Sequence, residues 1–237
     1  MIKKKVASYY KDAVGVVDAG LRTYMLRVFS YMSGGLALTA LVAYFVSSSP
    51  SLMAFLFYNP FVFAIITLAP LGISIYLVTQ LAHISKETAQ MLFLTYSTCL
   101  GMSLASIFIV YSGSSITSTF FVTSSMFLSM TIYGYVTDKD LTSWGSFLTM
   151  GLFGIIIASI INIFTHSSAF TFGISLLGVL IFTGLTAYDI QIIKSYYFES
   201  DNVEVSEKKA IYGALRLYLD FINLFLSLLR LVGSRRD

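Results

Sequence analysis

Apolar residues follow one another in long runs along this chain, and the charged residues between the runs leave regular gaps. No Asp, Glu, Lys or Arg occurs in residues 28–85, 88–137 or 141–188, so each gap is about 50 residues long. A helix needs about 20 apolar residues to cross the hydrocarbon core of a bilayer. Each gap therefore predicts two membrane-spanning helices and the turn between them.

Small polar connections divide these runs, at "SSSPS", "YSGSS" and "THSS". Such residues favour turns and end helices. The runs are too long for barrel strands and lack a period of two, which favours helices over strands. Pro60 and Pro70 are expected to interrupt the second run. We predict spanning helices at 25–47, 61–82, 88–111, 116–137, 143–164, 169–194 and 210–232.

The composition supports a membrane fold, because 57% of the residues are hydrophobic and only 11% are charged. Soluble domains have about 25% charged residues. We expect an all-α membrane protein of seven transmembrane helices, with residues 1–22 as a cytoplasmic tail and 23–237 as one transmembrane domain. The lipid bilayer is then the main partner. The small net charge of +3 does not indicate nucleic acid, and the single Cys99 excludes an internal disulfide.

Lysine and arginine are distributed unevenly between the two sets of connections. They occur in the N-terminal tail and in the connections at 83–87, 138–140 and 194–209, and are absent from 48–52, 112–115 and 165–168. Because cytoplasmic loops carry an excess of these residues, we expect the N-terminus in the cytoplasm. Arg230, Arg235 and Arg236 oppose this pattern. The last segment either spans against the local bias or re-enters, and we favour seven full spans because early helices usually dominate orientation.

Two carboxylates fall inside predicted spans. Asp189 lies toward the cytoplasmic end of the sixth span and Asp220 near the middle of the seventh. A charge at the centre of a spanning helix costs about 2.5 to 3.5 kcal/mol, so each must face water, the protein interior or a partner. Asp189 is close enough to the interface for a purely structural role. For Asp220 the structural alternative is an ion pair with Arg216 one turn earlier.

The polar residues of the last segment share one helix face. Arg216, Asp220, Asn223, Ser227 and Arg230 are separated by four, three, four and three residues, which is the spacing of one face. Every flank of this polar seam is apolar. The pattern predicts a last helix that lies centrally, ringed by the others, with the polar seam lining a path or a network.

Two carboxylates that meet in a low-dielectric site are costly to ionise together, so one holds a proton and hydrogen bonds to the other. Such a pair is a latch that closes at low pH and opens when it ionises. Carboxylate oxygens are also ligands that Ca²⁺ prefers. If their helices meet, Asp189 and Asp220 are candidates for pH sensing, gating and Ca²⁺ binding.

Four stretches of the chain resemble the transmembrane Bax inhibitor motif family. They are "YMSGGLALTALVAY", "YGYVTDKDLTSWGSFLTMGLFG", "LTAYDIQIIKSYY" and "ALRLYLDFINLFLSLLRLVG", between Tyr31 and Gly233. The resemblance implies seven helices with a central last helix, and a pH-sensitive Ca²⁺ leak whose paired acids match Asp189 and Asp220. Family members are also tied to suppression of cell death in eukaryotes and to restraint of a membrane protease in bacteria.

The chain departs from the family pattern at the end of the second span. Some members have an arginine there, which holds the acid of the sixth span in the closed state, whereas this chain has "LAHISK". His83 could serve instead, or be an ordinary loop histidine. Arg216 either replaces the missing arginine or neutralises Asp220 permanently. The candidate gate partners are thus Arg216, His83 and Asn223.

Three functions remain open on these grounds. The first is a pH-sensitive leak for Ca²⁺ or protons in a bacterial cytoplasmic (inner) membrane, which the short lysine-rich tail suggests. The alternative is a non-conducting regulator that binds other membrane proteins, such as a membrane protease. A secondary transporter would show an internal repeat, and none is evident. We expect no enzyme and no cofactor, because protease, zinc and retinal motifs are missing from the sequence.

Overall fold

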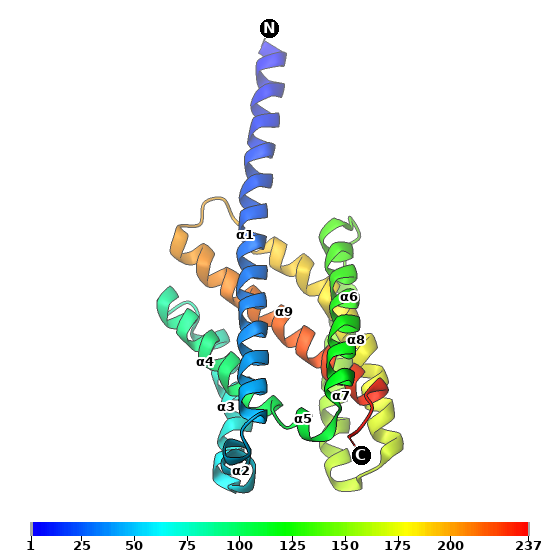
Figure 1. Ribbon diagram of the computed structural model, residues 1–237. Helices are drawn as coiled ribbons and strands as arrows, with labels where there is room; N and C mark the ends of the chain where they lie inside the picture. The colour runs from blue at the N-terminus through cyan, green and yellow to red at the C-terminus, as the bar shows by residue number, and fades with distance from the viewer. Residues whose placement is uncertain (1, 237) are drawn as a thin grey trace.

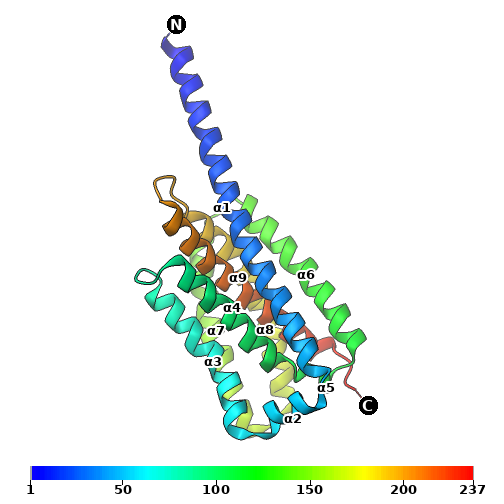
Figure 2. The same cartoon turned by 60° about the vertical axis from the view of Figure 1, so that its left-hand side comes forward.

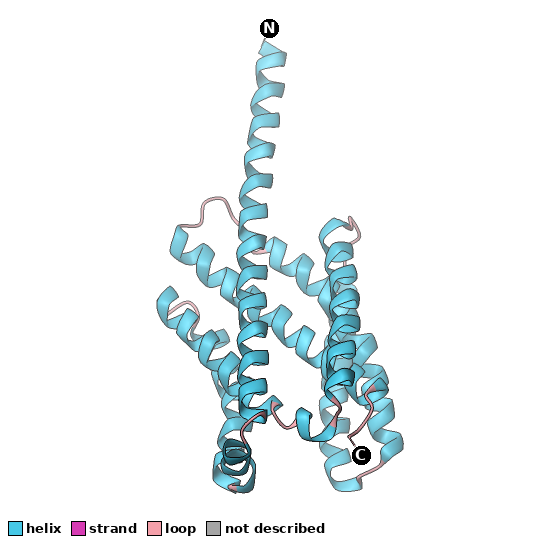
Figure 3. Ribbon diagram, in the orientation of Figure 1, coloured by secondary structure: helices cyan, strands magenta, loops and turns pink. Residues whose placement is uncertain are grey.

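The computed structural model describes the backbone of residues 2–236 and the side chains of residues 19–236. Met1, Asp237 and the side chains of the tail lysines lie outside that part. The described chain is a bundle of helices joined by short loops (Figure 1, Figure 3). One isolated β-bridge, Tyr111 to Arg235, is the extent of its β-structure. The predicted all-α class is confirmed.

The helix bounds follow the polar connections closely. The helices are α1 (Ile2–Ser47), α2 (Pro50–Tyr58), α3 (Pro60–Gln80), α4 (Lys86–Leu104), α5 (Ile107–Val110), α6 (Gly113–Val136), α7 (Thr142–Thr165), α8 (Ser168–Ser195) and α9 (Val203–Val232).

Polar side chains at the connections explain where several helices begin. Asn59 caps α3, Ser167 caps α8 and Asn202 caps α9 by accepting backbone N–H groups of the first turn. Pro60 follows Asn59 at the first position of α3, where a missing N–H costs nothing. Pro70 lies inside α3 without ending it, so the second predicted interruption is wrong.

Six helices are long and apolar enough to cross a membrane. They are Ala19–Ser47, Pro60–Gln80, Lys86–Val110, Gly113–Val136, Thr142–Thr165 and Ser168–Ser195. The chain is thus a multi-pass membrane protein in its helix lengths and composition. The predicted seventh span lies in α9, which is not among these six.

Helix α9 lies at the centre of the bundle, the position expected for the last helix. It packs against α1, α3, α4, α6 and α8, and its buried residues run from Ala210 to Leu229. Figure 2 shows α1, α4 and α8 around it. The apolar core of the molecule is therefore built on α9, and the polar residues of this helix must be satisfied within the bundle.

The two ends of the bundle differ, and we name them for what they carry. The charged end holds the connections at 81–85, 137–141 and 196–202. The C-terminal end holds those at 48–49, 105–112 and 166–167, and residues 233–236 (Figure 1). Helix α9 joins the two, because Lys208 Nζ donates to the Ile84 carbonyl at one end. At the other end Ser112 N–H donates to the Ser234 carbonyl.

Helix α1 is longer than any span requires. It begins at Ile2, and its first turns project beyond the charged end of the bundle (Figure 1, Figure 2). The part suited to crossing a membrane starts at Ala19. The segment predicted as a tail, residues 1–22, is thus continuous in backbone helix with the first span.

Candidate functional site

The carboxylate of Asp189 is held by Arg216 from the neighbouring helix. Arg216 Nε donates to Asp189 Oδ2 over 2.9 Å, and Nη2 donates to Oδ1 over 2.5 Å. The Asp189 side chain is 7% exposed and that of Arg216 is 27% exposed. Two-pronged pairing of this kind fixes geometry as well as charge. The structural alternative for Asp220, an ion pair with Arg216 within α9, is not formed, because Arg216 pairs with Asp189.

Asp220 stands beside this ion pair without a hydrogen-bond donor of its own. It is 5% exposed, and among the described residues no partner reaches its Oδ2. Asp189 and Asp220 line the same cavity, and their helices α8 and α9 pack against each other. The sequence prediction that the helices of Asp189 and Asp220 meet is therefore confirmed by the geometry.

The three side chains lie at one end of a cavity of about 700 Å³. Its walls come from α7, α8 and α9, with Leu71 of α3 on the remaining side. All five residues of the polar seam line it: Arg216, Asp220, Asn223, Ser227 and Arg230. The seam predicted from spacing alone thus faces one continuous space, which runs from the acid pair toward the C-terminal end.

The other two candidate gate partners lie apart from the acids. Asn223 lines the cavity, but its Nδ2 donates to the Leu219 carbonyl of its own helix over 2.8 Å. His83 is exposed in the turn between α3 and α4 and does not line the cavity. Of the three candidate gate partners, Arg216 is the one that bonds to Asp189 in the described part of the chain.

The site offers a small set of strong metal ligands. Within the described residues, no three His, Cys, Asp or Glu side chains gather closely enough to hold a metal ion. Asp189 and Asp220 supply carboxylate oxygens, whereas Ca²⁺ takes about six to eight oxygen ligands. Water and backbone carbonyls would have to complete a Ca²⁺ shell at this site.

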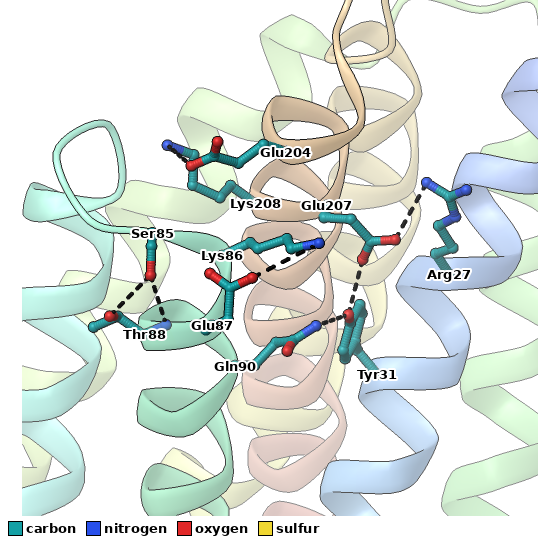
Figure 4. A network of polar contacts seen from close by, with 10 residues as sticks. All are labelled: Arg27, Tyr31, Ser85, Lys86, Glu87, Thr88, Gln90, Glu204, Glu207 and Lys208. Atoms are coloured by element: carbon teal, nitrogen blue, oxygen red, sulfur yellow. Dashed lines mark hydrogen bonds and ion pairs between the residues drawn. The ribbon is translucent and has the colours of Figure 1, made fainter.

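A second polar cluster, at the charged end, joins α1, α4 and α9 (Figure 4). Glu207 lies 3.3 Å from Arg27 Nη1 and accepts a hydrogen bond from the Tyr31 hydroxyl over 2.8 Å. Gln90 Nε2 donates to that hydroxyl over 2.6 Å. Sequence reasoning missed this cluster, because its members are far apart along the chain. In the sequence, only the charges of Arg27 and Glu207 indicate that polar partners are needed at this end.

Comparison with known proteins gives a consistent relationship over nearly the whole chain. A family model described as inhibitor of apoptosis-promoting Bax1 matches residues 21–237. Inner membrane protein YbhL of Escherichia coli (strain K12) is 44% identical over 227 residues, which are 95% of this chain and 97% of that protein. Uncharacterized protein RP147 of Rickettsia prowazekii (strain Madrid E) is 48% identical over 220 residues, 93% of each chain.

A more distant relative shows the same coverage. An uncharacterized membrane protein of Streptococcus pyogenes serotype M1 is 34% identical over 221 residues, 91% of this chain and 94% of that protein. The relatives named as membrane proteins agree with the six apolar helices. With the family model matching from the first span to the last residue, this chain belongs to the Bax inhibitor-1 family of multi-pass membrane proteins.

Proposed function

We propose that this protein is a pH-sensitive Ca²⁺ leak of the bacterial cytoplasmic membrane, gated by Asp189 and Asp220. The observation that carries the proposal is that two buried carboxyls, Asp189 and Asp220, line one cavity together with a polar seam. Buried ionisable groups in membrane helices mark ion or proton paths by default.

The gate works through one shared proton. At low pH Asp220 holds a proton that bonds to Asp189, and Arg216 balances the charge of Asp189. When the proton leaves, two carboxylates face a single guanidinium, and like charges in a low dielectric repel. Helices α8 and α9 are then driven apart, and the freed oxygens become ligands for a passing Ca²⁺.

The path requires α9 to cross the membrane as the seventh span, with the N-terminus in the cytoplasm. Support comes from its two ends, one beside Ile84 at the charged end and the other beside Ser112 at the C-terminal end. A helix that joins both ends of the bundle supports a full span over a re-entrant segment. The charged end then faces the cytoplasm, as the distribution of lysine and arginine predicts.

Ca²⁺ efflux from loaded proteoliposomes tests the leak. We expect efflux to rise with pH as the shared proton leaves, because the closed state needs that proton. Asp220→Asn cannot release a proton, so its efflux should lose most of this pH dependence. Efflux is followed with a Ca²⁺ indicator outside vesicles at a series of pH values.

Asp138→Asn is the matched control, because Asp138 is an exposed acid in the loop between α6 and α7. It should keep the pH dependence of the unmodified protein. Flux that ignores pH in every form, or no flux at all, would contradict the leak. The regulator of other membrane proteins would then remain, and the projecting part of α1 (Figure 2) is the surface that favours it.

A further inference from the structure

Among the described residues, the C-terminal end of the bundle carries arginines and no Asp or Glu. Arg230, Arg235 and Arg236 lie there, and residues 105–118, 163–172 and 228–236 contain no Asp or Glu. Arg236 Nη1 donates to the Phe108 carbonyl over 2.9 Å. Arg230 is exposed, lines the cavity and forms no ion pair within the described residues. Its charge is available to an anion.

The cavity that Arg230 lines is bounded by α7 and, on the other side, by Leu71 of α3, and α3 and α7 do not pack closely against each other, which leaves an opening between them. Helix α7 packs against α8 and against no other helix to a comparable extent. On the rim, Leu71 is 59% exposed, Ile160 is 53% exposed and Ile163 is 64% exposed. These are apolar side chains of membrane-spanning helices, so the opening faces the hydrocarbon of the bilayer. We call it the lateral groove.

The lateral groove has a polar floor and mostly apolar walls, so neither water nor hydrocarbon alone solvates all of it. Its floor is the polar seam of α9, whose far end holds Asp220 with an unpartnered, buried oxygen. Its walls are mostly apolar side chains of α7 and α8, with Thr149 and Ser159 among them. At about 700 Å³ it is within the range of about 300 to 1,000 Å³ that ligand sites occupy. An amphiphile with an anionic head and an apolar tail matches both the arginine and the walls.

From this geometry we infer that the lateral groove binds one anionic phospholipid. The phosphate lies at Arg230, and an acyl chain lies along α7 over the polar seam. The lipid forms the missing wall between α3 and α7. The lipid site shares the cavity of the proposed leak, but it rests on Arg230 and the walls of the groove, so lipid binding can be measured whether or not the protein conducts ions.

Native mass spectrometry of the full chain in detergent tests the headgroup. We expect one phosphatidylglycerol to remain bound, while phosphatidylcholine and free glycerol phosphate do not. Arg230→Gln should lower the bound fraction about fivefold, the equivalent of about 1 kcal/mol for one arginine at a lipid surface. Arg235→Gln, which changes a neighbouring arginine outside the groove, should leave binding unchanged.

Photo-crosslinking with a diazirine on the acyl chain tests the tail. We expect labelling of the α7 peptide, lost in Ile160→Trp, which fills the groove, and kept in Ile161→Trp, which points away from it. Equal binding of phosphatidylcholine, equal loss in Arg235→Gln, or equal labelling of both tryptophan variants would overturn the inference. So would a groove closed by a second copy of the chain, detected as a disulfide-linked dimer of Ile160→Cys without bound lipid.

Discussion

Arg216 holds Asp189 through two nitrogens of one planar group, and this geometry determines what each side chain contributes. A lysine offers a compact charge and cannot reproduce the fork. The pair also leaves Asp220 as the carboxyl without a cation of its own. The arginine therefore distinguishes two acids that would otherwise be equivalent, since one is neutralised by charge and the other by a proton.

Removing the arginine should destabilise the protein. Arg216→Gln leaves Asp189 buried and unpaired, and we expect a loss of about 3 kcal/mol in the free energy of unfolding. Adding Asp189→Asn should recover part of that loss, because both charges are then gone. The quantity is measured by reversible SDS unfolding in mixed micelles. Arg230→Gln, which breaks no ion pair, is the control, and simple additivity of the two changes would contradict the coupling.

Helices α1 and α4 approach each other closely through small residues. A side-chain carbon added at Gly101 would lie 2.8 Å from the Thr39 carbonyl oxygen, a contact with rigid backbone. The Thr39 hydroxyl in turn donates to the Ser97 carbonyl over 2.9 Å and lies 2.6 Å from the Tyr218 hydroxyl. Small residues permit this approach between membrane helices, and the buried hydroxyls fix its register against α9.

Substitution at the closest point should separate these helices. We expect Gly101→Ala to lower the free energy of unfolding by about 1 to 3 kcal/mol, because the added methyl group overpacks a rigid contact. Gly34→Ala is the matched control on α1, where an added carbon meets nothing within 4 Å. Equal melting temperatures for the two variants in detergent would show that α1 and α4 can move apart freely.

How far the sequence predicts this structure depends on how local each feature is. The six apolar spans and the polar seam were predictable, because hydropathy and helical spacing are properties of neighbouring residues. The partner of Arg216 was not, since an acid one turn away competed with one 27 residues distant on another helix. Glu207 and Tyr31 are 176 residues apart. The lateral groove exists because α3 and α7 do not pack closely against each other, and the pattern of neighbouring residues does not predict which helices pack together.

At the scale of the whole molecule, α9 joins the two ends of the bundle. Whether it spans therefore decides on which side of the membrane the C-terminus lies. A reporter protein fused after residue 237 should lie on the opposite side of the membrane from one inserted in the loop at 138–140. Alkaline phosphatase and green fluorescent protein fusions measure this, because each is active on one side of a bacterial inner membrane. Both reporters on the same side would show that the last helix does not span.

The central position of α9 has a consequence for synthesis. The ribosome releases this helix after α1, α3, α4, α6 and α8, the helices that it packs against. Until then Asp189 waits on α8 without the arginine that neutralises it, and α1 and α4 lack the Tyr218 hydroxyl between them. The bundle therefore cannot close early. A chain that stops before residue 203 should leave the Asp189 carboxylate without its arginine partner. We expect the quality-control proteases of the membrane to recognise such a chain as incompletely folded.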